Sequence, residues 1–147
     1  MAAIPYQGTT LNGYLLRPAG APGGRPVVIA PAGYDSTAEA GYPSAAVAAL
    51  RHGMNCLMFE GPGQGGVLYE QRLYFRPDYE AVLTPVVDWL LTQPGIGPAG
   101  LVLFGRSFGG HHPGVSPTVT AAAALAPSDA AMAIRRLPAP DPGTAKM

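Results

Sequence analysis

Residues 101–109 read Leu-Val-Leu-Phe-Gly-Arg-Ser-Phe-Gly, and this stretch decides the fold. Four apolar residues run directly into the pattern Gly-x-Ser-x-Gly, which has Ser107 at its centre. A short continuous apolar run is typical of a strand buried on both faces, and the glycines permit a sharp turn from that strand into a helix. The pattern predicts that Ser107 stands in a strained, exposed turn at the carboxyl edge of a parallel sheet.

The residues around this serine fit a nucleophile held in such a turn. Side chains at Gly105 and Gly109 would collide with neighbouring backbone, and Gly110 gives further clearance. A helix starting here would place the backbone N–H of Phe108 where an oxyanion forms, with support from the helix dipole. Because the five-residue pattern also occurs in plain Gly/Ser-rich turns, the assignment of Ser107 as nucleophile depends on the elements that come before it.

Those earlier elements alternate between strand and helix. Strands are expected at residues 11–17, 27–30, 55–59 and 100–104 and, more weakly, at the Ala-rich residues 119–126. The Gly- and Pro-rich residues 19–26 predict a hairpin-type loop, and residues 60–66 (EGPGQGG) predict a turn or loop.

Two helices are expected between these strands. Ser36 and Glu39 have the spacing of a capping box, Pro43 interrupts the helix they would start, and an Ala-rich helix follows over residues 44–51, with Gly53 as its C-terminal cap.

Apolar residues at three- and four-residue spacing predict the longest helix over residues 76–91, with a kink or break at Pro85. The alternation of strands and helices predicts an α/β fold with a mostly parallel sheet and helices on both faces. We expect one domain over residues 1–126 and a disordered tail over residues 127–147, which is rich in Pro and Ala.

The loop after the strand at residues 27–30 is the expected source of a second oxyanion donor. In the fold that a serine turn of this kind defines, this loop supplies a backbone N–H to the oxyanion. Gly33 and Tyr34 are both candidates, and the sequence does not choose between them. An ordinary strand-to-helix turn is the alternative interpretation.

Composition restricts the classes of partner. The net charge is zero, with nine basic and nine acidic residues, so we expect neither a nucleic acid nor an anionic membrane as partner. No apolar run approaches the roughly 18 residues of a membrane-spanning helix, and no secretory signal is visible. The single cysteine, Cys56, suits a small buried core position and a reducing cytoplasmic location.

Three motifs, taken together and in their order, resemble one family. They are residues 30–37 (APAGYDST), 59–65 (FEGPGQG) and 105–110 (GRSFGG). The stretch from Ile4 to Gly110 is similar to α/β-hydrolases of the dipeptidyl-aminopeptidase or acylaminoacyl-peptidase-like group, which includes pseudooxynicotine hydrolase-like enzymes. The resemblance implies a serine hydrolase that forms an acyl-enzyme on Ser107 and acts on an ester, amide, related acyl or activated carbon–carbon bond of a small molecule. It implies no cofactor and no metal.

The resemblance also implies an acidic residue and then a histidine after the serine, and these are not evident. His52 precedes Ser107 and is expected at a helix end, while His111 and His112 follow it too closely to act as its base. Asp129 is the only downstream acid expected at the end of a strand, and no histidine follows it. We therefore expect an incomplete α/β-hydrolase fold.

Pro113 and Gly114 interrupt the helix after the serine within about one turn, which strengthens that expectation. The alternatives are a non-catalytic remnant of such a hydrolase and an acyltransferase that uses the same serine turn. We expect self-association through an uncovered sheet edge. Arg106 is expected to orient backbone or face solvent, and Glu60 to bind nearby N–H groups rather than to act in catalysis.

Overall fold

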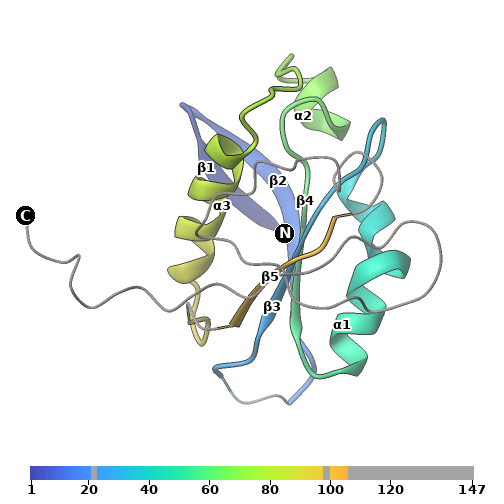
Figure 1. Cartoon of the computed structure of the whole chain (residues 1–147), viewed down its shortest axis with the longest axis vertical. Helices are drawn as coiled ribbons and strands as arrows, with labels where there is room; N and C mark the ends of the chain where they lie inside the picture. Colours follow the sequence, from blue (N-terminus) through green and yellow to red (C-terminus); the bar gives the residue numbers. More distant parts are fainter. Residues whose placement is uncertain (21–22, 98–99, 106–147) are drawn as a thin grey trace, which may run out of the picture.

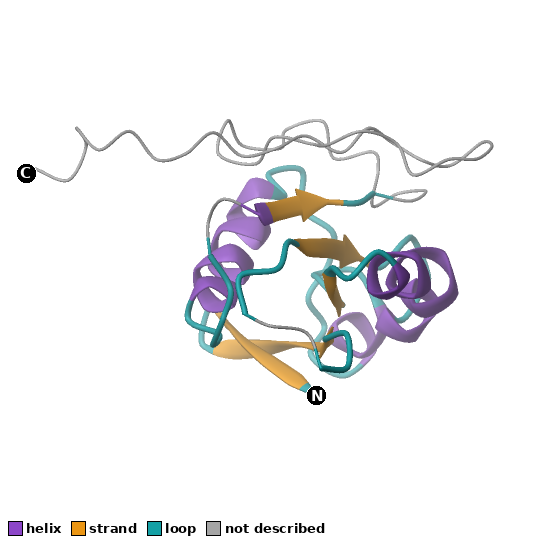
Figure 2. Ribbon diagram, turned by 90° about the horizontal axis from the view of Figure 1, so that it is seen from below, coloured by secondary structure: helices purple, strands orange, loops and turns teal. Residues whose placement is uncertain are grey.

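The computed structural model describes residues 1–20, 23–97 and 100–105. They form a five-stranded mixed sheet in the order β1-β2-β4-β3-β5, with helices on both faces (Figure 1, Figure 2). The strands are β1 (Ala2–Tyr6), β2 (Thr9–Leu16), β3 (Val27–Pro31), β4 (Asn55–Phe59) and β5 (Leu101–Leu103). The predicted α/β class is confirmed, whereas the expected strand at 119–126 and the tail at 127–147 lie outside the described residues.

The helices form two groups on opposite sides of the sheet. They are the 3₁₀ helix η1 (Ala38–Ala40), the π-helical turn η2 (Tyr42–Ala46) that runs into α1 (Val47–Arg51), then α2 (Gly65–Tyr69) and α3 (Glu80–Leu91). Figure 1 shows α3 on one side of the sheet and α1 on the other. Each covers its own buried apolar cluster, with Leu57 and Phe59 in the cluster under α3, and Cys56 and Met58 in the cluster under α1.

Three neighbouring strands, β4, β3 and β5, are parallel, which determines where a site can form. β3 pairs in parallel with both β4 and β5, so the carboxyl ends of all three strands meet at one edge of the sheet. Every residue of β3 and β4 is buried, as the continuous apolar runs predicted. The strands expected at residues 27–30, 55–59 and 100–104 are confirmed within a residue or two.

The amino-terminal part of the sheet is antiparallel and differs from the prediction. β1 was not predicted, and it forms a hairpin with β2 through Gln7 and Gly8, whose φ angles are +42° and +81°. The hairpin loop expected at residues 19–26 is wrong, because β2 has β1 and β4 as neighbours and β3 lies beyond β4. Those residues carry the chain across the sheet to a non-adjacent strand.

The segment before α1 also departs from its expected form. The capping box is wrong, since neither Ser36 nor Thr37 makes a side-chain cap, and the Ala38 N–H donates instead to the Glu60 carboxylate. Pro43 does not interrupt the helix, because it lies in the first turn of η2, where a backbone N–H, which proline lacks, would have no intrahelical acceptor.

The end of α1 is as predicted, with Gly53 in the left-handed conformation at φ +70°. The N–H groups of Gly53 and Met54 donate to the carbonyl oxygens of Leu50 and Ala49, the pattern of a Schellman cap. His52 occupies the C-cap position, as expected.

Two further helix boundaries were mispredicted. α3 begins at Glu80 and not at Arg76, because Pro77 disfavours the helical conformation of the residue before it, Arg76. The Arg76 guanidinium pairs instead with the Asp78 carboxylate at 2.7 Å. Pro85 lies inside α3 and does not end it. The short helix α2 occupies residues 65–69, so the loop expected over residues 60–66 ends one or two residues early.

Candidate active site

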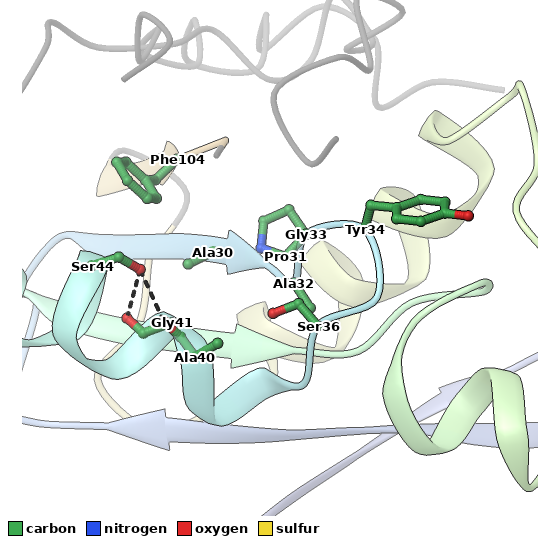
Figure 3. A pocket seen from close by; sticks show the side chains of 10 residues that line it. All are labelled: Ala30, Pro31, Ala32, Gly33, Tyr34, Ser36, Ala40, Gly41, Ser44 and Phe104. Atoms are coloured by element: carbon green, nitrogen blue, oxygen red, sulfur yellow. Dashed lines mark hydrogen bonds between the residues drawn. The ribbon is translucent and has the colours of Figure 1, made fainter. Parts of the chain in front are cut away.

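A cavity of about 320 Å³ opens at the carboxyl ends of β3 and β5 (Figure 3). Its walls come from the loop after β3, including Gly33 and Tyr34, from the turn between η1 and η2, and from the Phe104 side chain. Figure 3 shows the Tyr34 ring extending away from Phe104 and Ser44 toward the far end of the loop. The cavity therefore lies at the edge of the sheet where the sequence predicted the catalytic serine.

Phe104 connects β5 to this cavity. Its N–H donates to the carbonyl oxygen of Ile29 at 2.8 Å, which extends the parallel pairing one residue beyond β5. Gly105 follows and is buried. Ser107, Phe108 and Arg106 lie outside the described residues, so the nucleophile and the first oxyanion donor remain predictions.

The loop that carries the second oxyanion donor is fixed on one side by backbone contacts. The Ala32 N–H donates to the Phe59 carbonyl oxygen at 2.9 Å, which continues the pairing of β3 with β4. Within residues 1–20, 23–97 and 100–105, the Gly33 N–H has no hydrogen-bond acceptor. Gly33 lines the cavity, so this N–H suits an oxyanion donor better than that of Ala32.

The same loop is fixed on its other side by Gln64, a residue that the sequence analysis did not single out. Its side chain is fully buried, and its amide nitrogen donates to the Ala32 carbonyl oxygen. Its amide oxygen accepts from the Gly61 N–H at 2.7 Å and from the Tyr79 hydroxyl at 3.4 Å. The signal was present in the quoted motif FEGPGQG, where Gln64 is the single polar side chain after Glu60.

Glu60 has the structural role that the sequence predicted. It is buried, with Oε1 accepting from the Ala38 N–H at 3.1 Å and Oε2 from the Gly66 N–H at 2.9 Å. One carboxylate thus joins the start of η1 to the first turn of α2. Both carboxylate oxygens are occupied by backbone donors, which is the arrangement of a support and not of an acid–base catalyst.

Tyr34 and Asp35 form the outer end of the loop. The Tyr34 ring stacks on Phe75 with ring centroids 5.6 Å apart. Asp35 adopts a left-handed φ of +47°, and its Oδ1 accepts a hydrogen bond from the Tyr69 hydroxyl at 3.0 Å. That hydrogen bond, together with the charge of Asp35, raises the pKa of Tyr69. The loop is therefore also attached to the segment around α2.

The remaining candidates lie away from the cavity or outside the described residues. Cys56 is fully buried in β4, and burial raises the pKa of its thiol to about 12, so it is a core residue as predicted. His111, His112 and Asp129 lie outside the described residues. In the described part of the chain, no cluster of three or more His, Cys, Asp or Glu side chains is arranged to hold a metal. No described helix is long and apolar enough to cross a membrane.

Comparison with known proteins gives several clear relatives, although no model of a known protein family matches the sequence. The hydrolase LUC6 of Fusarium sp is 40% identical over 116 residues, which are 74% of this chain and 28% of that protein. The α/β hydrolase xenA of Xenoacremonium sinensis is 44% identical over 91 residues, 59% of this chain and 21% of that protein. The 20-hydroxy-prefusarin hydrolase FUS2 of Gibberella moniliformis is 37% identical over 116 residues, 74% of this chain and 28% of that protein.

A solved structure agrees with these relatives. The crystal structure of 2,6-dihydroxy-pseudo-oxynicotine hydrolase has a TM-score of 0.68 and 32% identity over 76% of this chain and 30% of that protein. The chain thus spans between a fifth and a third of the length of the relatives named here. The sequence similarity and the structural similarity agree, and the chain belongs to the α/β-hydrolase superfamily.

Proposed function

We propose that the chain carries the nucleophile and the oxyanion site of a serine hydrolase that cleaves an ester, amide or related acyl bond through an acyl-enzyme on Ser107. The observation that carries the proposal is the cavity between Gly33 and Phe104 at the carboxyl ends of β3 and β5. The chain runs directly from this cavity wall into the Gly-x-Ser-x-Gly pattern.

Chain connectivity supports the position of the serine. Ser107 is two residues beyond Gly105, and two residues span at most about 7 Å. Because Phe104 lines the cavity and the chain continues from it through the buried Gly105, this short span supports our proposal that Ser107 acts at the cavity. A strand followed by this pattern is the context in which the pattern denotes a nucleophile.

The proposed chemistry uses two backbone donors. In the whole enzyme that the resemblance implies, the Ser107 hydroxyl oxygen attacks the acyl carbon, a histidine that is not evident in this chain takes its proton, and the former carbonyl oxygen becomes the oxyanion. The Gly33 N–H, or that of Tyr34, and the Phe108 N–H donate to this oxyanion. Collapse of the intermediate expels the alcohol or amine, and water then releases the acid.

The relatives support a small organic substrate. Two of them are named for hydroxylated small molecules, 20-hydroxy-prefusarin and 2,6-dihydroxy-pseudo-oxynicotine. The cavity, at about 320 Å³, has a size that suits part of such a molecule.

A fluorophosphonate probe tests the assignment of the nucleophile. We expect the probe to label the wild-type chain and not the Ser107→Ala variant. Ser44→Ala is the matched control, because Ser44 also lines the cavity but its hydroxyl donates to the Ala40 carbonyl oxygen at 3.2 Å. Equal labelling of wild type and Ser107→Ala would contradict the proposal.

The reaction type is tested separately with an activated acetate ester. Intact mass spectrometry should show one added acetyl group on the wild-type chain and none on Ser107→Ala. Release of acetate to water identifies a hydrolase, whereas its transfer to an added alcohol, with little free acetate, identifies an acyltransferase.

A further inference from the structure

A second cavity, of about 560 Å³, lies on the other side of the Tyr34 loop. Four aromatic side chains line it together with Leu68 and Asp35, namely Tyr34, Tyr69, Tyr74 and Phe75. Tyr34 lines both this cavity and the 320 Å³ cavity beside β5, so the two cavities adjoin each other at Tyr34. A molecule that extends past Tyr34 would occupy both.

Asp35 makes this second cavity electrostatically negative. It is the one charged residue in the lining formed by the described residues, and neither lysine, arginine nor histidine is present there. Oδ1 accepts from the Tyr69 hydroxyl, whereas Oδ2 has no hydrogen-bond or ion-pair partner among residues 1–20, 23–97 and 100–105. A carboxylate oxygen is therefore available to a ligand.

The aromatic side chains add to the attraction for a cation. The face of a phenol or phenyl ring is electron-rich and attracts an ammonium group within about 6 Å of the ring centre. Tyr69 and Tyr74 are highly exposed, so both can contact a ligand in this cavity. An anion would be repelled by Asp35, and a neutral ligand could donate a hydrogen bond to its second oxygen but would lack the attraction between opposite charges.

We propose that this cavity binds an organic ammonium group, through the Asp35 carboxylate and the rings of Tyr69 and Tyr74. We assign this ammonium group to the substrate, whose acyl group would lie in the 320 Å³ cavity on the other side of Tyr34. This assignment rests on the function proposed above. Binding of a free ammonium compound does not rest on it. The substrate class is then an acyl compound with a protonated or quaternary amine.

Choline and its neutral carbon analogue, 3,3-dimethylbutan-1-ol, test the proposal because they have nearly the same shape. Titration of the 147-residue chain, followed by NMR of the tyrosine ring protons, should give an affinity for choline about two- to fivefold higher than for the neutral alcohol. Equal affinities would overturn the proposal.

Variants then locate the binding. Asp35→Asn should remove most of the preference for choline and leave the binding of 3,3-dimethylbutan-1-ol unchanged. Asparagine tolerates the left-handed φ of this position and still accepts the Tyr69 hydrogen bond, so the fold is kept. Tyr74→Leu should weaken choline binding, whereas Tyr42→Leu, at an exposed tyrosine that lines neither cavity, should not.

The outcomes separate this proposal from that of the hydrolase. One outcome is that the chain prefers choline to the neutral alcohol, that Asp35→Asn abolishes this preference, and that the phosphonate does not label Ser107. The ammonium site then stands and the hydrolase proposal fails. If choline is preferred equally by wild type and Asp35→Asn, the cation binds elsewhere and the proposed site is wrong.

Discussion

The side-chain amide of Gln64 donates a hydrogen bond to the carbonyl oxygen of Ala32, and this contact joins the loop after β4 to the loop after β3. Gln64 is fully buried, and its amide oxygen also accepts from the Gly61 N–H at 2.7 Å. The peptide group that bears the Gly33 N–H is therefore held, through the Ala32 carbonyl oxygen, by a side chain that does not line the cavity. Gln64 is a positioning residue for the proposed oxyanion site.

Replacement of Gln64 by leucine should destabilise the chain and loosen this loop. The Gly61 N–H and the Ala32 carbonyl would lose their side-chain partner in a buried setting, which costs about 1–3 kcal/mol for each unsatisfied group. We expect a lower free energy of unfolding in urea and faster hydrogen exchange at the Ala32 amide, which donates to the Phe59 carbonyl oxygen.

Gln71→Leu is the control for this prediction. Gln71 also bridges two segments, accepting from the Thr9 hydroxyl at 2.8 Å and donating to the Thr10 carbonyl at 2.9 Å, but it does so near the surface. Its loss should cost about 0.5–1.5 kcal/mol, the net value of an ordinary hydrogen bond, and leave exchange at the Ala32 amide unchanged. Equal effects of both variants on the Ala32 amide would contradict the positioning role of Gln64.

Gly65 should tolerate no side chain, because the Glu60 carboxylate occupies the space beside it. A Cβ on Gly65 would overlap the Glu60 carboxyl group, and its φ of +42° disfavours any L-residue. Left-handed backbone costs roughly 1–2 kcal/mol and overpacking about 1–3 kcal/mol, so Gly65→Ala should lower the free energy of unfolding by about 2–5 kcal/mol. Gly97→Ala, at a site with open space around it, should change it by less than about 0.5 kcal/mol.

The parallel centre of the sheet could be predicted from sequence because its signals are local. β3 is a continuous apolar run, and so is β4 after Asn55, and burial on both faces requires that composition wherever the strand stands in the sheet. β1 was missed although Ala2, Ile4 and Tyr6 alternate with exposed residues and Gln7-Gly8 forms a tight turn. Pro5 argues against a central strand, but it is acceptable on an edge strand, which is the position of β1.

The sequence predicts the backbone positions of the candidate site, but it does not predict the side-chain contacts that hold this backbone in place. Gly33 and Tyr34 were identified because a fixed motif places that loop after a strand, and both line the cavity. The contact of Gln64 with Ala32 spans 32 residues of sequence, and no local pattern predicts which buried amide meets which carbonyl. The stacking of Tyr34 on Phe75 is likewise a consequence of tertiary packing.

Cys56 should be unreactive in the folded chain and should make stability depend on alkaline pH. Burial raises the pKa of its thiol from the ordinary value near 9 to about 12. Because the folded pKa is the higher one, the contribution of this thiol to stability is fully present below about pH 9 and is lost as the pH rises from 9 toward 12. Cys56→Ala should therefore show a smaller decline in the free energy of unfolding over that range.

Thiol labelling provides an independent measurement of the same environment. An aromatic disulfide reagent at pH 8 should react with Cys56 only after urea unfolds the chain. Rapid labelling of the native chain would show that the thiol is accessible and would contradict its place in the core under α1.

The last prediction concerns the edge of the sheet at β5. Among the described residues β5 pairs with β3 alone, and the N–H of Phe104 points toward β3. Since successive N–H groups along a strand alternate in direction, the Leu103 N–H points to the other side, where it can pair with a second chain. We expect the 147-residue chain to self-associate as its concentration rises, which size-exclusion chromatography with light scattering would detect.

Hydrogen exchange identifies the strand responsible. If β5 pairs between chains, protection of the Leu103 amide should increase with protein concentration, while the Val102 and Phe104 amides, which face β3, serve as internal controls at constant protection. A monomer at every concentration, with cooperative unfolding above about 60 °C, would show instead that this edge is closed. Concentration-dependent protection in β1 and not in β5 would place the contact on the opposite edge strand, where Pro5 already removes one donor.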